Sequence, residues 1–208
     1  MKLENLKINF LGDSITFGYG VSSQDETFHQ IIKREYGLKE AYNCGISGTR
    51  IAKQTNPSEH QCDLYYGLRA KVMPRDVDAI VVFGGTNDFG HGDAQFGDID
   101  GTDIYTFYGA LNNLIFSLKE DYPNSKIIFM TPLRRTTEDV KNSNGKILAD
   151  YVDAIIEVSN KHNLPVIDLF RSDIFDPNDA TKVPDGLHPN KEGHIIMADY
   201  IAKKLLEI

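Results

Sequence analysis

Short runs of mostly apolar residues recur along the chain, and polar loops follow most of them. The runs cover residues 8–11, 41–46, 79–83, 126–130 and 165–169, of which the second is the weakest. Each run is shorter than a typical helix, and its apolar residues are nearly continuous rather than alternating. This pattern is typical of strands that are covered on both faces, as in a parallel sheet. The sequence therefore predicts five buried strands.

The longer stretches between these runs have apolar residues at helical spacing. Clear stripes cover residues 104–118, 148–158 and 195–205. Weaker patterns predict a helix over residues 25–36 that ends at Gly37, and another over residues 60–72. Pro189 suits the first position of the last helix, because proline is favoured there.

Strands that alternate with helices in this way predict an α/β fold, with one parallel sheet covered by helices on both faces. We expect one domain over residues 1–208, because no linker or repeat divides the chain. In such sheets, ligands bind at the carboxyl ends of the strands. The polar residues that follow each strand are therefore the place to look for a functional site.

Composition and charge limit the classes of partner. The chain has 22 Lys and Arg against 30 Asp and Glu, which gives a net charge of −8. Without clustered cations, we expect it to bind neither nucleic acid nor a membrane surface. Residues 1–10 contain no apolar signal segment, so we expect a cytoplasmic protein, or a secreted one whose leader was removed. Cys44 and Cys62 are expected to be free thiols.

Five residues near the predicted strand ends carry the groups that ester hydrolysis needs. Ser14 supplies a hydroxyl at a strand-to-helix turn, and His188 supplies an imidazole that can take its proton. Asp185 lies three residues before His188, close enough for its carboxylate to orient the ring. Gly48 offers a backbone N–H without an obstructing Cβ, and Asn87 offers a side-chain amide as a second donor for an oxyanion. Each residue alone is ordinary turn or cap chemistry, but together they predict a serine hydrolase.

Four sequence blocks resemble those of the SGNH hydrolases, also called GDSL esterases and lipases. The blocks appear in the family's order and are Gly12-Asp13-Ser14, residues 43–49, residues 84–88 and Asp185-x-x-His188. The resemblance implies a flavodoxin-like, three-layer α/β/α sandwich with a five-stranded parallel sheet. It also implies Ser14 as the nucleophile and His188 as the general base oriented by Asp185. The implied oxyanion donors are the N–H groups of Ser14 and Gly48 and the amide of Asn87.

The predicted substrate is a small or short-chain carboxylic ester, because no long apolar insertion is present to act as a lid. An O-acetyl group on a carbohydrate is the first expectation, and the resemblance leaves lysophospholipid-type esters and thioesters open. Residues 53–66 and 89–103 are expected to shape the leaving-group side. Phe89 and Phe96, in the second of these stretches, suit stacking on a sugar, although a surface loop would have the same composition.

Four further polar residues are candidates for contact with the substrate. Asp13 and His91 are predicted to bind it, and Arg134 and Arg135 either meet an anionic or sugar group or form a solvated pair. No metal is expected, because His91 and Asp93 have no defined third ligand beside them.

A non-catalytic module that binds a flavin or a carbohydrate on the same sheet is the alternative function. Such a module needs neither Ser14 nor His188, which argues against it. The fingerprints of nucleotide-binding folds are also missing, because Gly18 and Gly20 are followed by Ser23 instead of a third glycine, and no phosphate-binding loop occurs. The G-x-S-x-G elbow of the α/β-hydrolases is absent too. No cofactor is therefore expected.

Overall fold

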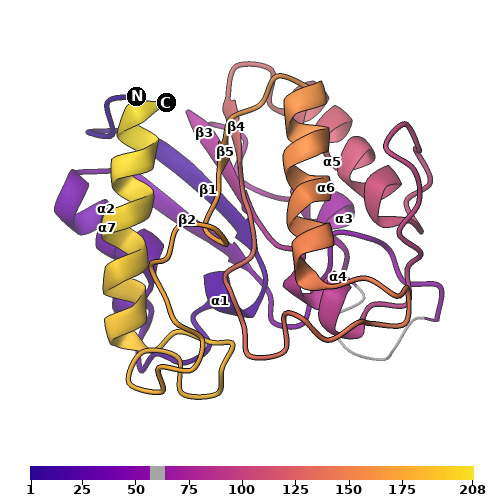
Figure 1. Ribbon diagram of the computed structural model, residues 1–208. Coiled ribbons are helices and arrows are strands. Elements are labelled where there is room, and N and C mark those ends of the chain that lie inside the picture. The colour runs from indigo at the N-terminus through magenta and orange to yellow at the C-terminus, as the bar shows by residue number, and fades with distance from the viewer. Residues whose placement is uncertain (57–63) are drawn as a thin grey trace.

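A parallel sheet of five strands forms the centre of the computed structural model, which describes residues 1–56 and 64–208 (Figure 1). The strand order is β2-β1-β3-β4-β5. The strands are β1 (Lys7–Gly12), β2 (Glu40–Gly45), β3 (Ala79–Phe83), β4 (Lys126–Met130) and β5 (Val166–Ile167). The prediction of five parallel strands is confirmed. β5 is shorter than predicted because the chain turns at Asp168, whose carboxylate accepts the backbone N–H of Arg171 at 3.2 Å.

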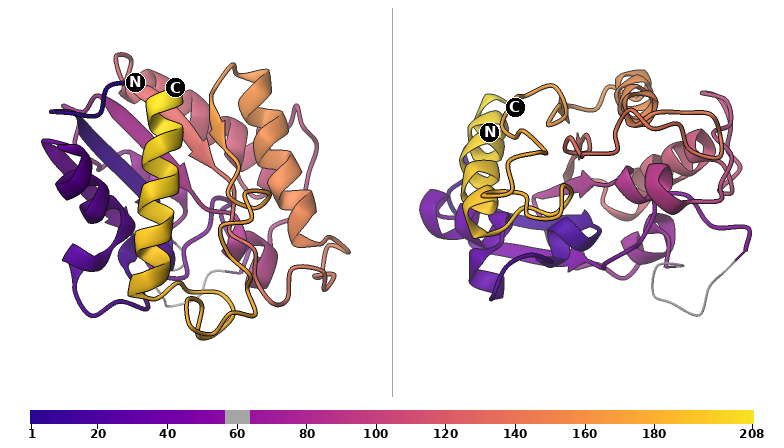
Figure 2. Two further views of the ribbon diagram at one scale, coloured as in Figure 1. Left: turned by 60° about the vertical axis from the view of Figure 1, so that its left-hand side comes forward. Right: turned by 60° about the horizontal axis from the view of Figure 1, so that its bottom comes forward.

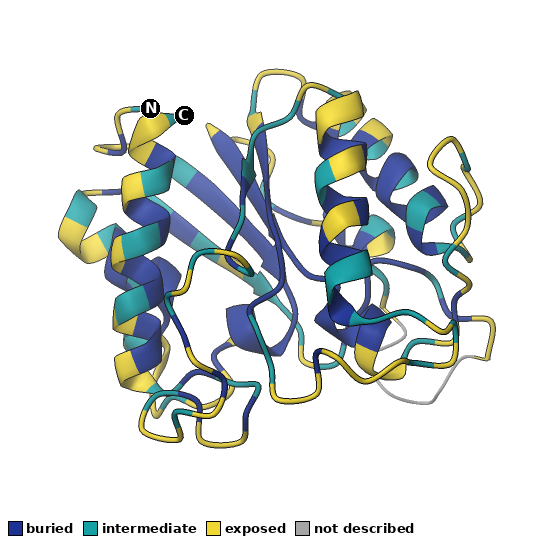
Figure 3. Ribbon diagram, in the orientation of Figure 1, coloured by how far each residue is buried: buried dark blue, intermediate teal, exposed yellow. Residues whose placement is uncertain are grey.

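The side chains of each strand alternate between two apolar cores, one on each face of the sheet. On β3, Ile80 and Val82 belong to one core, while Val81 and Phe83 belong to the other. The first core is completed by α3 (Tyr66–Ala70), α5 (Phe107–Asp121) and α6 (Leu148–Lys161), and the second by α2 (Phe28–Tyr36) and α7 (Lys191–Glu207). Figure 3 shows most of the sheet buried between these two layers of helices, whereas the edge strand β2 is only partly buried. The α/β fold with helices on both faces of the sheet is therefore confirmed.

Side-chain caps determine where two of the predicted helices begin. α5 begins after Thr106, whose hydroxyl accepts the N–H of Gly109 at 3.2 Å. α7 begins after Asn190, whose side-chain oxygen accepts the N–H of Gly193 at 3.2 Å. Pro189 therefore lies before the cap, and the prediction that it occupies the first helical position was wrong.

The two weaker helical patterns also correspond to helices. A short 3₁₀ helix, η1 (Gln24–Glu26), precedes α2, and α2 ends at Gly37 with a left-handed φ of 72°, as predicted. The helix predicted over residues 60–72 is represented by α3, and residues 57–63 lie outside the described part of the chain.

Two short helices next to strand ends were not predicted as elements. They are α1 (Ser14–Phe17) and α4 (Thr86–His91), of 4 and 6 residues. Neither is long enough to show a helical repeat of apolar residues. Both begin just beyond the carboxyl end of a strand, where the predicted catalytic residues lie.

The two ends of the chain meet beside α7, as Figure 2 shows. The terminal ammonium of Met1 donates to the carbonyl of Leu205 at 2.9 Å. Met197, Ile201 and Leu205 form the buried stripe of α7.

None of the helices in residues 1–56 and 64–208 is long and apolar enough to cross a membrane.

Candidate active site

Ser14, His188 and Asp185 form a continuous chain of hydrogen bonds. Ser14 Oγ lies 2.9 Å from Nε2 of His188, a residue 174 positions further along the chain. His188 Nδ1 lies 2.7 Å from Oδ2 of Asp185. A hydroxyl, an imidazole and a carboxylate in this sequence are the groups of a catalytic triad. The folded chain therefore brings together the three residues that were predicted to act as one unit.

The loop that carries His188 is held by the carboxylate of Asp185. Besides contacting the ring, Asp185 accepts the backbone N–H groups of Leu187 at 3.0 Å and of His188 at 2.7 Å. Partial burial would by itself raise the pKa of Asp185, but hydrogen bonds from the backbone and ring of His188 and from the Leu187 N–H outweigh it and lower the pKa. Asp185 is therefore an anion that fixes both the position and the tautomer of the His188 ring.

Ser14 is the first residue of α1, and Asp13 caps this helix. The Asp13 carboxylate accepts the N–H of Ile15 at 3.1 Å and is only 2% exposed. Burial, with a smaller contribution from the nearby Asp88, raises the pKa of Asp13 to about 7, although the N–H of Ile15 and the charge of Arg69 act in the opposite direction. Substrate binding by Asp13 stays a prediction, but the contacts of this carboxylate are those of a helix cap.

Each of the three predicted oxyanion donors has an N–H group that no protein acceptor occupies among the described residues. Within the described part of the chain, the backbone N–H groups of Ser14 and Gly48 donate to no protein acceptor. Gly48 has a left-handed φ of 75°, a conformation that side chains other than glycine rarely adopt. The Asn87 amide donates one N–H to the carbonyl of Thr49 at 3.0 Å, which leaves its second N–H free. These are the three donors that the resemblance implied.

Arg69 on α3 is a site residue that the sequence analysis missed. It is 6% exposed, and its guanidinium donates to the carbonyl of Gly12 at 2.8 Å, to the hydroxyl of Thr49 at 2.7 Å and to the carbonyl of Cys44. It thereby ties the ends of β1 and β2 to the loop that follows β2. Its partners are mostly backbone oxygens, which leave no pattern in a sequence.

Asp88 fixes the segment that follows this loop. Its two carboxylate oxygens accept the N–H groups of Ile51 at 3.0 Å and of Ala52 at 2.9 Å. The side chain is 3% exposed, and burial raises its pKa to about 6 although these hydrogen bonds act in the opposite direction. Asp88 was part of a matched block, but no role had been predicted for it.

The candidate ligands of the substrate differ in their surroundings. His91 lies at the end of α4, where its Nε2 is 3.0 Å from Oδ1 of Asn87. Arg134 pairs with Glu138 at 2.6 Å. Arg135 is half-buried over the ring of Phe89 and donates to the carbonyl and hydroxyl of Thr86 at 3.3 and 3.2 Å. The two arginines therefore do not form one solvated pair.

Phe89 and Phe96 are not placed to stack on a sugar. Phe89 is 4% exposed and packs edge-on against Tyr151, because α4 turns it into the core. Phe96 packs against Phe107, Tyr108 and Tyr151. An exposed aromatic residue, Tyr19, lies beside the triad, because it is 55% exposed and its ring centroid lies 4.4 Å from that of His188.

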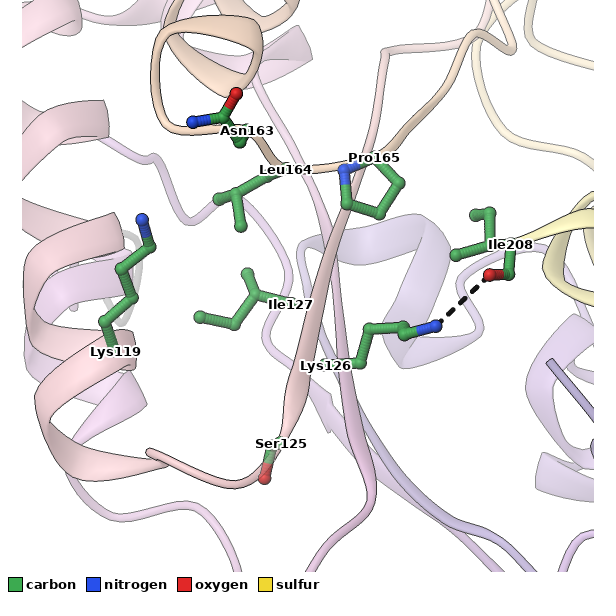
Figure 4. Close-up of a pocket in the computed structure, with 8 residues that line it drawn as sticks. All are labelled: Lys119, Ser125, Lys126, Ile127, Asn163, Leu164, Pro165 and Ile208. Atoms are coloured by element: carbon green, nitrogen blue, oxygen red, sulfur yellow. Dashed lines mark hydrogen bonds between the residues drawn. The ribbon is translucent and has the colours of Figure 1, made fainter.

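A separate cavity of about 750 Å³ lies at the opposite end of the sheet, at the start of β4 (Figure 4). Its lining includes Lys119, Ile127, Leu164 and Ile208, and the ammonium of Lys126 donates to a main-chain oxygen of Ile208 at 3.2 Å. None of the predicted site residues lines it.

Cys44 is a half-buried free thiol, as expected, and burial raises its pKa to about 11. Cys62 lies outside the described residues.

The arrangement of Ser14, His188 and Asp185 on this α/β fold is that of a serine-hydrolase triad. The comparison with protein families agrees, because residues 10–196 match the GDSL-like Lipase/Acylhydrolase family. The chain belongs to this family.

Individual relatives extend the comparison. An acetylxylan esterase of Xylanibacter ruminicola is 27% identical over 97% of this chain and 43% of its own length. The chain thus spans less than half of that relative. A solved structure of a Lactobacillus plantarum protein is 29% identical, covers 98% of both chains and has a TM-score of 0.83. A lipase/acylhydrolase from Enterococcus faecalis shares the fold, with 23% identity, a TM-score of 0.66 and coverage of 96% of this chain and 95% of its own.

Proposed function

We propose that the protein is a serine esterase that hydrolyses a small or short-chain carboxylic ester through an acyl-enzyme on Ser14. The observation that carries the proposal is the 2.9 Å contact between Ser14 Oγ and His188 Nε2. A flavin- or carbohydrate-binding module without chemistry has no use for this contact. Family membership supports the same conclusion.

The first half of the reaction forms the acyl-enzyme. Ser14 Oγ attacks the ester carbonyl while His188 Nε2 takes the hydroxyl proton, and Asp185 stabilises the resulting imidazolium. The tetrahedral oxyanion is bound by the N–H groups of Ser14 and Gly48 and by the free N–H of Asn87. The carbon–oxygen bond to the alcohol then breaks, and His188 gives its proton to the departing alkoxide. The products of this half are the acyl-serine and the free alcohol.

The second half releases the acid. His188, neutral again, takes a proton from a water molecule that attacks the acyl carbonyl. The same three N–H groups bind the second oxyanion. When this intermediate collapses, the bond to Ser14 Oγ breaks and the oxygen recovers its proton from His188. The enzyme returns to its starting state after one ester and one water have become an acid and an alcohol.

Tyr19 supports a sugar, rather than a long alkyl chain, as the alcohol part of the substrate. His188 must lie next to the leaving oxygen to protonate it, and Tyr19 packs on His188 while keeping most of its side chain exposed. An exposed aromatic ring at this position suits the apolar face of a carbohydrate. The acetylxylan esterase named above is a relative with this kind of substrate in its name. An O-acetyl group on a carbohydrate is therefore the first candidate.

The test compares Ser14→Ala with Ser159→Ala, which makes the same change in a buried serine of α6 whose hydroxyl has no hydrogen-bond partner among the described residues. Hydrolysis of p-nitrophenyl acetate and of acetylated xylo-oligosaccharides is measured, together with the mass of the protein after treatment with a fluorophosphonate. We expect Ser14→Ala to lose nearly all turnover and all labelling, and Ser159→Ala to retain both. Wild-type turnover by Ser14→Ala would refute the mechanism.

A further inference from the structure

The orientation of the Asn87 amide matters for the oxyanion, and this amide can adopt two orientations of nearly equal shape. In one orientation Nδ2 faces the oxyanion and donates to it. In the other, Oδ1 takes that place and repels the developing negative charge. The carbonyl of Thr49, 3.0 Å from Nδ2, favours the first orientation. A second contact, on the opposite side of the amide, favours it as well.

This second contact comes from His91, one helical turn after Asn87 on α4. Residues four apart on a helix lie on one face, and His91 Nε2 is 3.0 Å from Asn87 Oδ1. Oδ1 can only accept a hydrogen bond, so the contact stabilises the amide only when Nε2 carries the ring proton. The tautomer of His91 therefore determines whether the contact is attractive.

Arg50 selects that tautomer. Its guanidinium donates from Nη2 to Nδ1 of His91, and also to the backbone carbonyl of His91 at 2.9 Å. Because a guanidinium has only donors, Nδ1 must offer a lone pair, and the single ring proton is left on Nε2. Arg50 is 8% exposed, so solvent competes little for this contact. Burial and the charges of Arg50 and Arg135 lower the pKa of His91, which keeps the ring neutral.

We propose that Arg50 and His91 form a hydrogen-bond relay that holds the Asn87 amide with its N–H toward the oxyanion, so that His91 is a positioning residue for catalysis. The relay runs from the Arg50 guanidinium through the His91 ring to the Asn87 amide. Both ring nitrogens of His91 are occupied by protein groups, so neither is free to bind a substrate. The cation of Arg50 beside Nδ1 also disfavours a metal ion there. This inference rests on the proposed function, because it assigns a purpose to the Asn87 amide only if an oxyanion forms.

The test replaces the ring with one that lacks the donor. His91→Phe keeps an aromatic side chain that has no N–H, whereas His91→Gln retains an amide N–H that can reach Asn87 at the same helical spacing. For p-nitrophenyl acetate we expect His91→Phe to lower kcat by about tenfold or more, which is less than the ~10²–10³ expected for Asn87→Ala. KM should change by no more than about twofold, because the interaction acts mainly in the transition state. His91→Gln should recover part of the loss.

A double-mutant cycle separates positioning from a general effect on the fold. If His91 acts only through Asn87, then His91→Phe should cause no further loss of kcat once Asn87 is replaced by Ala. His162→Phe is the matched control. This change removes a similar contact, in which His162 Nε2 at the end of α6 lies 2.9 Å from Asn112 Oδ1 on α5. Because neither residue belongs to the proposed site, kcat should not change.

Two results would overturn the relay: an unchanged kcat in His91→Phe, or an equal loss of kcat from this change with and without Asn87. Either result together with an inactive Ser14→Ala would reject the relay and leave the esterase mechanism intact. An active Ser14→Ala would reject the mechanism itself, and the relay with it. If His91→Phe does not fold, His91→Gln still decides, because any fall in its kcat should disappear in the Asn87→Ala background.

Discussion

Replacing the buried His194 should change how the stability of the protein depends on pH. His194 lies on α7 and is fully buried. Its Nδ1 accepts the backbone N–H of Phe28 at 3.0 Å, and its Nε2 has no hydrogen-bond partner among the described residues. Burial, and to a smaller extent the nearby His29, lowers the pKa of His194 to about 4, although Glu26 acts in the opposite direction. The folded protein therefore holds this ring neutral in mild acid.

The size of the effect follows from the difference in pKa between the two states. Between the ordinary value of 6.5 and the folded value of about 4, only the unfolded chain binds the proton. Stability is therefore fully present above pH 6.5 and is lost as the pH falls toward 4. At ~1.4 kcal/mol per pKa unit, the loss over this range is about 3 kcal/mol.

Other buried groups hide this loss in the wild-type protein. His29, whose pKa burial lowers to about 4, acts in the same direction. Asp13 and Asp88, with pKa values raised to about 7 and about 6, act in the opposite direction. Between pH 3.8 and these raised values the folded protein binds their protons and the unfolded chain does not. Their contribution to stability is therefore lost as the pH rises through this range. The wild-type profile should therefore be shallow, and only the difference between wild type and variant isolates His194.

The assay is urea unfolding of wild type and His194→Gln at pH 7.5 and pH 4.5. The chain has 10 Tyr and no Trp, so far-ultraviolet circular dichroism is the suitable probe. Relative to the variant, the wild type should lose about 2–3 kcal/mol of unfolding free energy between the two pH values. If the difference between the two proteins were the same at both pH values, His194 would titrate normally in the folded state and the reasoning would be wrong.

Three further substitutions test other parts of the structure. Gly45→Ala places a Cβ 2.3 Å from the backbone nitrogen of Phe17, so urea unfolding should show a loss of about 1–3 kcal/mol in unfolding free energy, and kcat should fall as α1 shifts. Unchanged stability would contradict the close approach of the two segments. Asp185→Asn should lower kcat by about 10³–10⁴ in the p-nitrophenyl acetate assay, because the His188 tautomer is no longer fixed, and should leave the thermal midpoint unchanged. A loss of kcat below about tenfold would argue against this role of Asp185. Thr106→Ala should cost about 1 kcal/mol of stability through the lost cap of α5 and leave kcat unaltered, whereas a fall in kcat would show that the cap also supports the site.

The strands could be predicted from the sequence because the physical cause of their burial is local. A run such as residues 79–83 is apolar at every position, since alternate side chains enter different cores and both cores exclude water. The carboxyl ends of parallel strands lie at one edge of a sheet, so the residues after the strands could be predicted to meet. The order β2-β1-β3-β4-β5 depends on which faces pack together, and no local pattern in the sequence determines it.

The errors in the predicted site have a different physical origin. Phe89 was predicted to suit stacking on a sugar, but α4 directs it into the core. Tyr19 was overlooked because an exposed aromatic residue in a loop has no special sequence context. Its position against His188 results from contact between residues that are far apart in the chain.

Two buried ionic groups hold, from opposite ends, the segment that we propose binds the oxyanion. Arg69 donates to the Thr49 hydroxyl, and Asp88 accepts the N–H groups of Ile51 and Ala52. Burying each group costs free energy, as the pKa of Asp88 near 6 indicates, and neither group touches the reacting atoms. Replacing Asp88 by an apolar residue would remove the buried charge but leave two backbone N–H groups without acceptors. Because Gly48 lies in the same loop, this cost is best explained by the need to hold its N–H in place before the oxyanion forms, rather than by the stability of the fold alone.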